Sequence, residues 1–255
     1  MFVLETKGLS KIYGSKGKGV AVKALDNFSM AVKEGEFLGV MGPSGSGKTT
    51  LLNILATIDT PSSGEVLING ENPHKLNKDS LALFRRKNLG FIFQDFNLLD
   101  TLSVKENIAL PLVLDGVNSM EIERKVRELA KVLDIENILN KRTYEISGGQ
   151  QQRTACARAL INNPSIILAD EPTGNLDSKA SNDLMEALER INKERGATIV
   201  MVTHDAFAAS FCNRIIMIKD GKFFLEIVKS STRKVFFKEI LDSLSLIGGG
   251  YNEAI

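Results

Sequence analysis

Hydrophobic and polar positions alternate along the first ninety residues in short runs that are typical of an α/β fold. Apolar runs predict strands at three places: residues 22–32, 37–41 and 65–68. Residues 47–57 predict a helix, because their apolar side chains can share one buried face. Those side chains are Leu51, Leu52, Ile54 and Leu55. The order of strand, turn and helix at residues 37–57 is the part that matters for function.

Residues 95–162 change character, because helical patterns replace the strand-like runs. The first helix is expected to begin near Ser103 and the second at Asn118, with Glu121 reaching back to complete a capping box. The second helix carries apolar residues at spacings of four, three and four: Ile122, Val126, Leu129 and Leu133. This pattern predicts an amphipathic helix.

Strand-like composition returns at residues 165–169 and 197–203, with a helix between them. That helix is marked by Leu184, Leu188 and Ile191. The sequence therefore predicts a helical lobe that interrupts an α/β core. Residues 223–228 then predict part of a hairpin, residues 230–232 a break, and the following residues a short amphipathic helix through Leu244. The glycines at 248–250 predict a flexible end.

The composition of the 255 residues excludes several classes of protein. There are 32 basic and 31 acidic side chains, so the net charge of +1 argues against a nonspecific nucleic-acid binder. No apolar run approaches the roughly 20 residues of a spanning helix, and no secretory signal is readable, which predicts a cytosolic chain. Cys156 and Cys212 form no metal or disulfide pattern, so both are expected to be buried thiols.

A glycine-rich loop lies directly after one predicted strand and directly before a predicted helix. Its sequence is Gly42-Pro43-Ser44-Gly45-Ser46-Gly47-Lys48-Thr49, followed by Thr50. This is the phosphate-loop pattern GxxxxGK[ST] in the context that such a match requires. The glycines let the backbone curl so that its N–H groups point at phosphate oxygens. We expect Lys48 to neutralise the β- and γ-phosphates and Thr49 to supply a hydroxyl to Mg²⁺.

Two acidic residues follow the apolar run 165–169, and in a parallel sheet that strand end would bring them beside the phosphate loop. We expect Asp170 to hold the coordination shell of Mg²⁺. Glu171 is then placed to orient and deprotonate the attacking water as a general base. Taken alone, an Asp-Glu pair after a strand is more often a solvated strand end, and the phosphate loop reverses that preference.

A second glycine pair lies in the predicted helical lobe, in the run Glu145-Ile146-Ser147-Gly148-Gly149-Gln150. Ser147 can cap a helix that runs to about Leu160, and the glycines allow the helix N–H groups to approach an anion closely. Together with the phosphate loop and the acidic strand end, this run resembles the signature sequence LSGGQ of ATP-binding cassette (ABC) proteins. Ile146 stands in place of the leucine.

The resemblance covers residues 2 to about 228 and implies a fold. That fold is a P-loop NTPase (RecA-like) α/β core with an N-terminal antiparallel β subdomain and an inserted α-helical subdomain at about 95–162. The nucleotide-binding domain would occupy residues 1–228 and a C-terminal helical tail residues 229–255. The resemblance also implies an ATPase with ATP and Mg²⁺ as cofactors.

Four more residues match motifs of the family. Tyr13 resembles the aromatic residue that stacks on adenine, and Gln94 resembles the glutamine that contacts Mg²⁺ and links the core to the helical lobe. Asp177 resembles the D-loop aspartate, here in Gly-Asn-Leu-Asp instead of the commoner Ser-Ala-Leu-Asp, or it simply caps the next helix. His204 resembles the switch histidine at the γ-phosphate, whereas His74 is expected on a surface loop.

The family's architecture implies two copies of the chain. In such proteins the ATP on one chain's phosphate loop is closed over by the signature helix of a second chain. The resemblance therefore implies a homodimer around two MgATP, with Ser147, Gly148, Gly149 and Gln150 acting on the partner's nucleotide. Closure would drive a separate integral-membrane permease, which implies a cytoplasmic chain on the inner face of the membrane. No nucleic-acid partner is expected.

Finer similarities point to a subgroup. Residues 89–94 and 170–175 resemble macrolide-export and lipoprotein-release ATPases, and residues 94–102 and 236–241 resemble the bacitracin-export type. We therefore predict a role in resistance to antimicrobial peptides. A lipoprotein- or macrolide-type export ATPase and a soluble ABC ATPase of a non-transport assembly machine remain alternatives. A DNA-repair or translation ABC protein is not expected, because it would normally carry a coiled-coil insertion or two cassettes.

The predicted C-terminal helix carries its own apolar face. Its members are Val235, Phe236, Ile240, Leu241 and Leu244. Such a face either covers the core of this chain or contacts a partner, and the sequence does not choose between the two.

Overall fold

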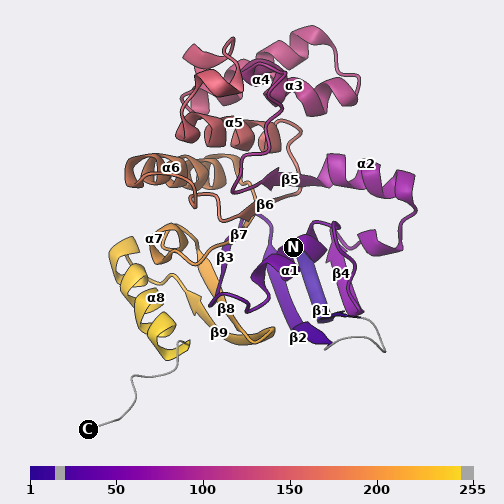
Figure 1. Ribbon diagram of the computed structural model, residues 1–255, viewed down its shortest axis with the longest axis vertical. Helices are drawn as coiled ribbons and strands as arrows, with labels where there is room; N and C mark the ends of the chain where they lie inside the picture. The colour runs from indigo at the N-terminus through magenta and orange to yellow at the C-terminus, as the bar shows by residue number, and fades with distance from the viewer. Residues whose placement is uncertain (15–20, 248–255) are drawn as a thin grey trace.

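The computed structural model describes residues 1–14 and 21–247 as an α/β core topped by a helical lobe (Figure 1). The core is built on a six-stranded sheet whose spatial order is β5-β6-β7-β3-β8-β9. In that order the strands are Leu89–Ile92, Ile166–Asp170, Ile199–Val202, Phe37–Met41, Arg214–Lys219 and Lys222–Val228. The first five are parallel and β9 runs antiparallel to β8.

A separate antiparallel sheet packs beside this core, in the order β2-β1-β4. Its strands are Val22–Lys33, Phe2–Tyr13 and Ser63–Ile68. The strand at 65–68 was predicted, but its membership of a second sheet follows only from its pairing with β1. The apolar pattern did not indicate β1, β5 or β8.

The side chains of the six-stranded sheet alternate between two hydrophobic cores, as the period of two in a strand requires. On β3, for example, Phe37 and Met41 enter the core under the helical lobe. Leu38 and Val40 enter the core shared with the antiparallel sheet and helix α1 (Lys48–Leu55). Helix α6 (Ser178–Arg195) belongs to the first core. Helices α1 and α6 therefore cover opposite faces of the sheet.

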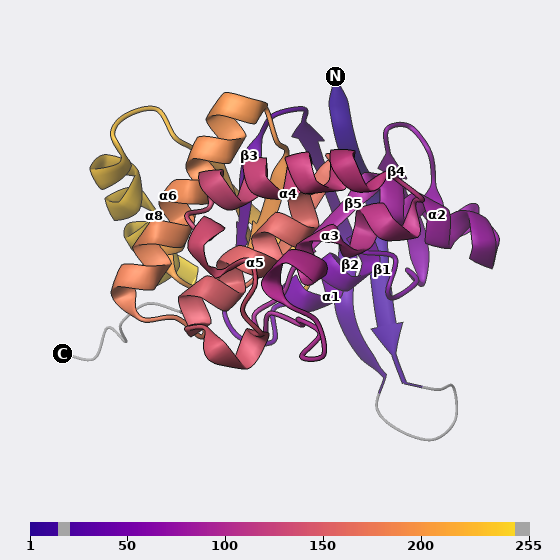
Figure 2. The same ribbon diagram turned by 90° about the horizontal axis from the view of Figure 1, so that it is seen from above.

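The helical lobe contains α3, α4 and α5, which lie above the sheet in Figure 1 and over it in Figure 2. These helices are Val104–Leu114, Ser119–Val132 and Gly148–Leu160, with short 3₁₀ turns at Glu136–Ile138 and Thr143–Glu145. The remaining helical segments are the 3₁₀ turn η1 (Pro73–Lys75), α2 (Lys78–Asn88), α7 (Ala206–Ala209) and α8 (Arg233–Ile247). The predicted interruption of the α/β core by helices is present.

Side-chain caps set the starts of the lobe helices, and these starts lie where the sequence predicted them. Ser103 caps α3 in a complete capping box, and Asn118 accepts a hydrogen bond from the N–H of Glu121 at the start of α4. The predicted reach-back of Glu121 is wrong, because its carboxylate lies 3.4 Å from Lys125 one turn further on. An i,i+4 ion pair and a cap are alternatives for the same carboxylate, and here the ion pair forms.

The C-terminal helix α8 uses its apolar face inside this chain. Phe236 and Ile240 are fully buried and join the main core, whereas Val235 and Leu241 stay exposed. Of the two alternatives for this face, the structure therefore favours the cover over the chain's own core. The predicted flexible glycines at 248–250 lie outside the described residues. In the described part of the chain, none of the helices is both long enough and apolar enough to span a membrane.

Candidate active site

The phosphate loop joins β3 to α1, and its glycines serve different purposes. Gly45 and Gly47 have φ values of +76° and +102°, which favour glycine. A Cβ on Gly47 would also lie 2.3 Å from the carbonyl oxygen of Ala24. Gly42 has no positive φ, but a Cβ there would lie 2.1 Å from the carbonyl oxygen of Ile218. Gly42 is therefore required by packing against β8 and not by the curl of the loop.

Lys48 begins α1 with its ammonium group folded over the loop. Its Nζ donates to the carbonyl oxygens of Gly42 at 2.8 Å and Pro43 at 2.9 Å. Burial lowers the pKa of Lys48, and the carboxylates of Glu171 and Asp170 oppose that shift. The cation is thus held at the loop by neutral oxygens and two acids, where an incoming phosphate can replace the carbonyl contacts.

Asp170 ends β6 and Glu171 follows it, and β7 lies between that strand and β3. The register places Asp170 beside Val202 of β7 and Val202 beside Val40 of β3, so the strand ends lie side by side. Burial, reinforced by Glu171, raises the pKa of Asp170. Glu171 has a left-handed φ of +43° and donates its N–H to the carbonyl of Val202 at 2.9 Å. A left-handed non-glycine residue costs about 1–2 kcal/mol, and such strain concentrates at functional sites.

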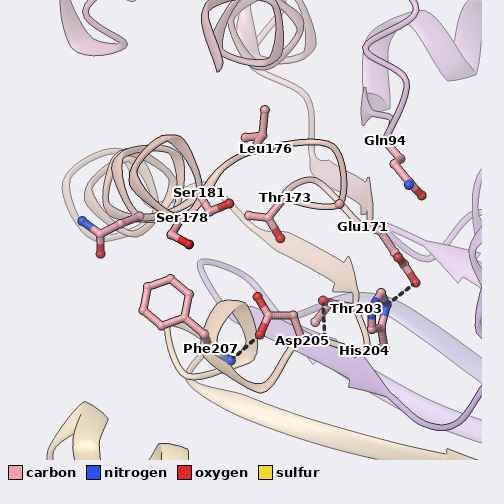
Figure 3. A pocket seen from close by; sticks show the side chains of 12 residues that line it. Gln94, Glu171, Thr173, Leu176, Ser178, Ser181, Thr203, His204, Asp205 and Phe207 are labelled. Carbon is pink, nitrogen blue, oxygen red and sulfur yellow. Dashed lines mark hydrogen bonds and ion pairs between the residues drawn. The ribbon is translucent and has the colours of Figure 1, made fainter. Parts of the chain in front are cut away.

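His204 follows β7 and contacts the carboxylate of Glu171. Its Nδ1 lies 2.9 Å from Oε1 of Glu171 (Figure 3). The His204 side chain is 68% exposed and that of Glu171 is 23% exposed. One carboxylate oxygen is therefore held by the imidazole, and the other can accept a hydrogen bond from water.

A cavity of about 730 Å³ opens beside this pair. Gln94, Glu171 and His204 lie around it, together with residues from the start of α6 and from α7 (Figure 3). The other lining residues are Thr173, Gly174, Leu176, Ser178, Ser181, Asn182, Thr203, Asp205 and Phe207. Three residues that the sequence assigned to separate motifs therefore share one solvent-accessible space.

Tyr13 ends β1 and is 40% exposed. Its hydroxyl donates to Asp59 at 2.7 Å, and the ammonium of Lys11 lies 4.9 Å from the ring centroid. Burial and the bond to Asp59 raise the pKa of Tyr13, and Thr50 opposes them. The ring is therefore fixed in place with a cation over it. Sequence reasoning missed Asp59, which is 46 positions from Tyr13 and lies in the segment that leads into β4.

The loop that carries Gln94 is held by two side chains of α5. The buried Gln152 donates to the carbonyls of Phe93 at 3.1 Å and Pro172 at 2.7 Å. Arg158 donates to the carbonyls of Phe96 and Asn97, which both have left-handed φ values. Sequence reasoning missed both anchors. A glutamine within the apolar buried face of α5 was the available signal, because a buried polar side chain needs partners.

The signature segment begins α5 with a complete capping box. The N–H of Gln150 donates to Ser147 Oγ at 3.4 Å, and the N–H of Ser147 donates to Gln150 Oε1 at 3.0 Å. The N–H groups of Gly148 and Gly149 have no intrahelical acceptor at these positions, which suits an anion. A Cβ on Gly149 would lie 2.9 Å from Cβ of Ala180, so this glycine also lets α5 pack on α6.

Three other expectations meet the structure differently. Asp177 caps α6 by accepting the N–H of Ala180 at 2.8 Å, so its D-loop role stays a prediction. His74 is not on a surface loop, because it is half-buried in η1 with Nε2 3.1 Å from the carbonyl oxygen of Ile54. Cys156 and Cys212 are buried free thiols as predicted, and burial raises the pKa of Cys156 to about 12.

The donors around the phosphate loop suit Mg²⁺ and phosphate. Thr49, Asp170 and Gln94 offer hydroxyl, carboxylate and amide oxygens, and Mg²⁺ prefers oxygen ligands. Within the described residues, the buried Oγ of Ser46 has no hydrogen-bond partner, so the loop keeps a polar group for a ligand. The residues present therefore fit a magnesium–nucleotide complex.

Comparison with known proteins agrees with this geometry. Residues 25–174 match the sequence model of the ABC transporter family. The chain is 59% identical over 253 residues to the ABC transporter ATP-binding protein YvcR of Bacillus subtilis, covering 99% of this chain and 98% of YvcR. It is 48% identical over 255 residues to the bacitracin export ATP-binding protein BceA of Halalkalibacterium halodurans, covering 99% of this chain and 100% of BceA.

A solved structure has the same fold. It is the dimeric, post-hydrolysis form of the ATP-binding cassette MJ0796, from Methanocaldococcus jannaschii, bound to ADP and Pi. The two chains superpose with a TM-score of 0.81 at 42% identity, covering 89% of this chain and 99% of the cassette. The predicted fold class is therefore confirmed.

Proposed function

Because the chain belongs to the ABC transporter family, as one of its ATP-binding and ATP-hydrolysing subunits, we propose that it drives a separate permease in resistance to peptide antibiotics. The observation that carries this proposal is the end-to-end similarity to a bacitracin export ATP-binding protein, which extends through the C-terminal tail. The proposed place of action is the inner face of the cell membrane. Macrolide export is the second candidate, because relatives with that name match 86% of this chain.

The positions of the two nucleotide motifs support a working unit of two copies. The phosphate loop leads into α1, which belongs to the core on one face of the six-stranded sheet. The signature segment begins α5, which belongs to the core on the opposite face. The signature of one chain is therefore separated by a sheet from its own phosphate loop. We propose that it closes over the nucleotide of a second copy, with Asp177 at the contact.

The proposed chemistry assigns one task to each side chain. Tyr13 stacks on adenine, and the loop N–H groups with Lys48 hold the phosphates. Thr49, Asp170 and Gln94 hold Mg²⁺, which supplies neutralisation of the phosphate charge. Glu171 accepts the proton of the attacking water, because its second carboxylate oxygen is not used by His204. His204 keeps the carboxylate oriented and reaches the γ-phosphate side of the site.

The assignment of the base can be tested with Glu171→Gln. The amide keeps the size of the side chain and still accepts a hydrogen bond, but it does not take up the proton. ATP hydrolysis is expected to fall about 10²-fold or more, while ATP binding persists. The variant should then accumulate as an ATP-bound dimer that light scattering detects. Near-normal turnover would assign the base to another group, with His204 the first to examine.

The biological role needs a test in cells. We expect deletion of the gene, or Lys48→Ala, to increase sensitivity to bacitracin and nisin but not to an antibiotic with an intracellular target. Lys193→Ala is the matched control, because Lys193 is an exposed lysine near the end of α6 that pairs with Glu189 one turn earlier. Unchanged sensitivity in both strains, with the protein shown to be expressed, would refute the resistance role and favour macrolide export or an assembly machine.

A further inference from the structure

We propose that Asn175 is a positioning residue that orients the side-chain amide of Gln94, leaving its carbonyl oxygen free to bind a cation. The inference rests on the proposed role of Gln94 at Mg²⁺ and extends it to a residue outside the set of ligands. Asn175 lies in the loop between β6 and α6, 81 positions from Gln94, and two of its side-chain hydrogen bonds join the two residues.

The orientation of the Asn175 amide is set by its acceptors. Its Nδ2 donates to the backbone carbonyl of Gln94 at 3.2 Å and to Oδ1 of Asp95 at 2.9 Å. A carbonyl oxygen and an ionised carboxylate only accept hydrogen bonds, so a flipped Asn175 would place its own oxygen against two others. The nitrogen therefore has to face Gln94 O and Asp95.

The fixed amide of Asn175 then determines that of Gln94. With its nitrogen used, Asn175 presents Oδ1 to the side chain of Gln94, whose Nε2 donates to it at 3.3 Å. A flipped Gln94 would bring two carbonyl oxygens together at that distance. The Nε2 group of Gln94 is therefore committed to Asn175, and Oε1 points away from it. Only this oxygen can bind Mg²⁺, because an amide nitrogen keeps its protons at neutral pH.

The contacts that α5 makes with the loop do not orient the side-chain amide of Gln94. The contacts of α5 with the loop end on backbone carbonyls: Gln152 on that of Phe93, and Arg158 on those of Phe96 and Asn97. They fix the path of the loop and not the rotation of the Gln94 amide. Gly174 makes the approach possible, because a Cβ there would lie 3.0 Å from the amide of Gln94. The segment Gly174-Asn175 is thus shaped around the Gln94 side chain.

The same contact connects Gln94 to the proposed base. The N–H of Gly174 donates to the carbonyl of Glu171 at 2.9 Å, so Asn175 is fastened to the turn that carries Glu171. Gln94 and Glu171 also border the same cavity (Figure 3). A displacement of that turn would therefore rotate or release the Gln94 amide.

The test measures how ATP binding depends on Mg²⁺. Titration calorimetry in Mg²⁺ and in EDTA is run on Asn175→Ala, which removes the acceptor for Gln94, and on Asn175→Asp. The aspartate keeps the shape, but its second oxygen replaces the donor and is repelled by the carbonyl of Gln94 and by Asp95, which displaces the side chain from Gln94. For both variants we expect the Mg²⁺ concentration that half-restores tight ATP binding to rise about 10-fold, the lower end for lost outer-shell support. The affinity for ATP in EDTA should be unchanged. A general folding defect would lower that affinity as well, so this measurement separates the two explanations.

Two further variants make the result decisive. Asn118→Ala is the matched control: it removes one exposed asparagine hydrogen bond, the cap of α4, and should leave the Mg²⁺ dependence unchanged. Gln94→Ala should show a shift at least as large as that of Asn175→Ala. A shift in Gln94→Ala without one in either Asn175 variant would overturn the positioning role alone. No shift in Gln94→Ala would overturn both that role and the proposed Mg²⁺ contact.

Discussion

The hydroxyl of Tyr13 is expected to matter for nucleotide binding although it does not stack. It is bound to Asp59 at 2.7 Å, and Lys11 forms an ion pair with the same carboxylate while lying over the ring. Hydrogen bonds from Lys11 and Tyr13 lower the pKa of Asp59 although burial acts in the opposite direction, so the anchor is ionised at neutral pH. Tyr13→Phe keeps the aromatic face and removes only the hydrogen bond to Asp59.

The size of the effect follows from two contributions. Loss of base–aromatic stacking in Tyr13→Ala should weaken ATP binding by about 1–3 kcal/mol. A partly exposed hydrogen bond contributes about 0.5–1 kcal/mol, so Tyr13→Phe and Asp59→Ala should each raise the dissociation constant of ATP about 2- to 5-fold. Both substitutions break the same bond. Asp59→Ala also removes the ion pair with Lys11, so the double variant should cost no more than Asp59→Ala alone.

Titration calorimetry with ATP measures all four variants, and Asp242→Ala controls for the loss of one exposed negative charge on α8. Strictly additive effects of Tyr13→Phe and Asp59→Ala would show that the two side chains act independently. An unchanged dissociation constant in Tyr13→Ala would remove the assignment of Tyr13 to adenine altogether.

Two predictions concern stability. Gly149→Ala places a methyl group 2.9 Å from Cβ of Ala180, and such overpacking should cost about 1–3 kcal/mol of folding stability. Calorimetry should show Tm lowered by about 2–4 °C per kcal/mol. An unchanged Tm would mean that α5 and α6 separate freely. Burial lowers the pKa of His74 from 6.5, so the unfolded chain binds more protons and the free energy of unfolding should fall as pH drops below about 6.5. His74→Gln should therefore lose less Tm than the native chain between pH 7.5 and 5.5, and equal losses would contradict the account.

Much of the local structure could be predicted from the sequence. The starts of α3, α4, α5 and α6 were indicated by Ser103, Asn118, Ser147 and Asp177, and all four residues cap those helices. A cap acts on an N–H two or three residues away, so its signal lies within a single turn of sequence. The phosphate loop was equally local, because one strand, one loop and one helix follow each other without a break.

The sequence by itself therefore determined the family, the helix starts and the candidate residues of the site. The tertiary structure decided what lies between them: β7 separates the acidic strand end from β3, and β1 joins a second sheet. It also brought His74 to the carbonyl of Ile54, Tyr13 to the carboxylate of Asp59, and Gln94 to the side-chain amide of Asn175. These partners are 20, 46 and 81 positions apart. Such contacts leave no periodic or local mark, because they form only after packing has brought separate strands and loops together.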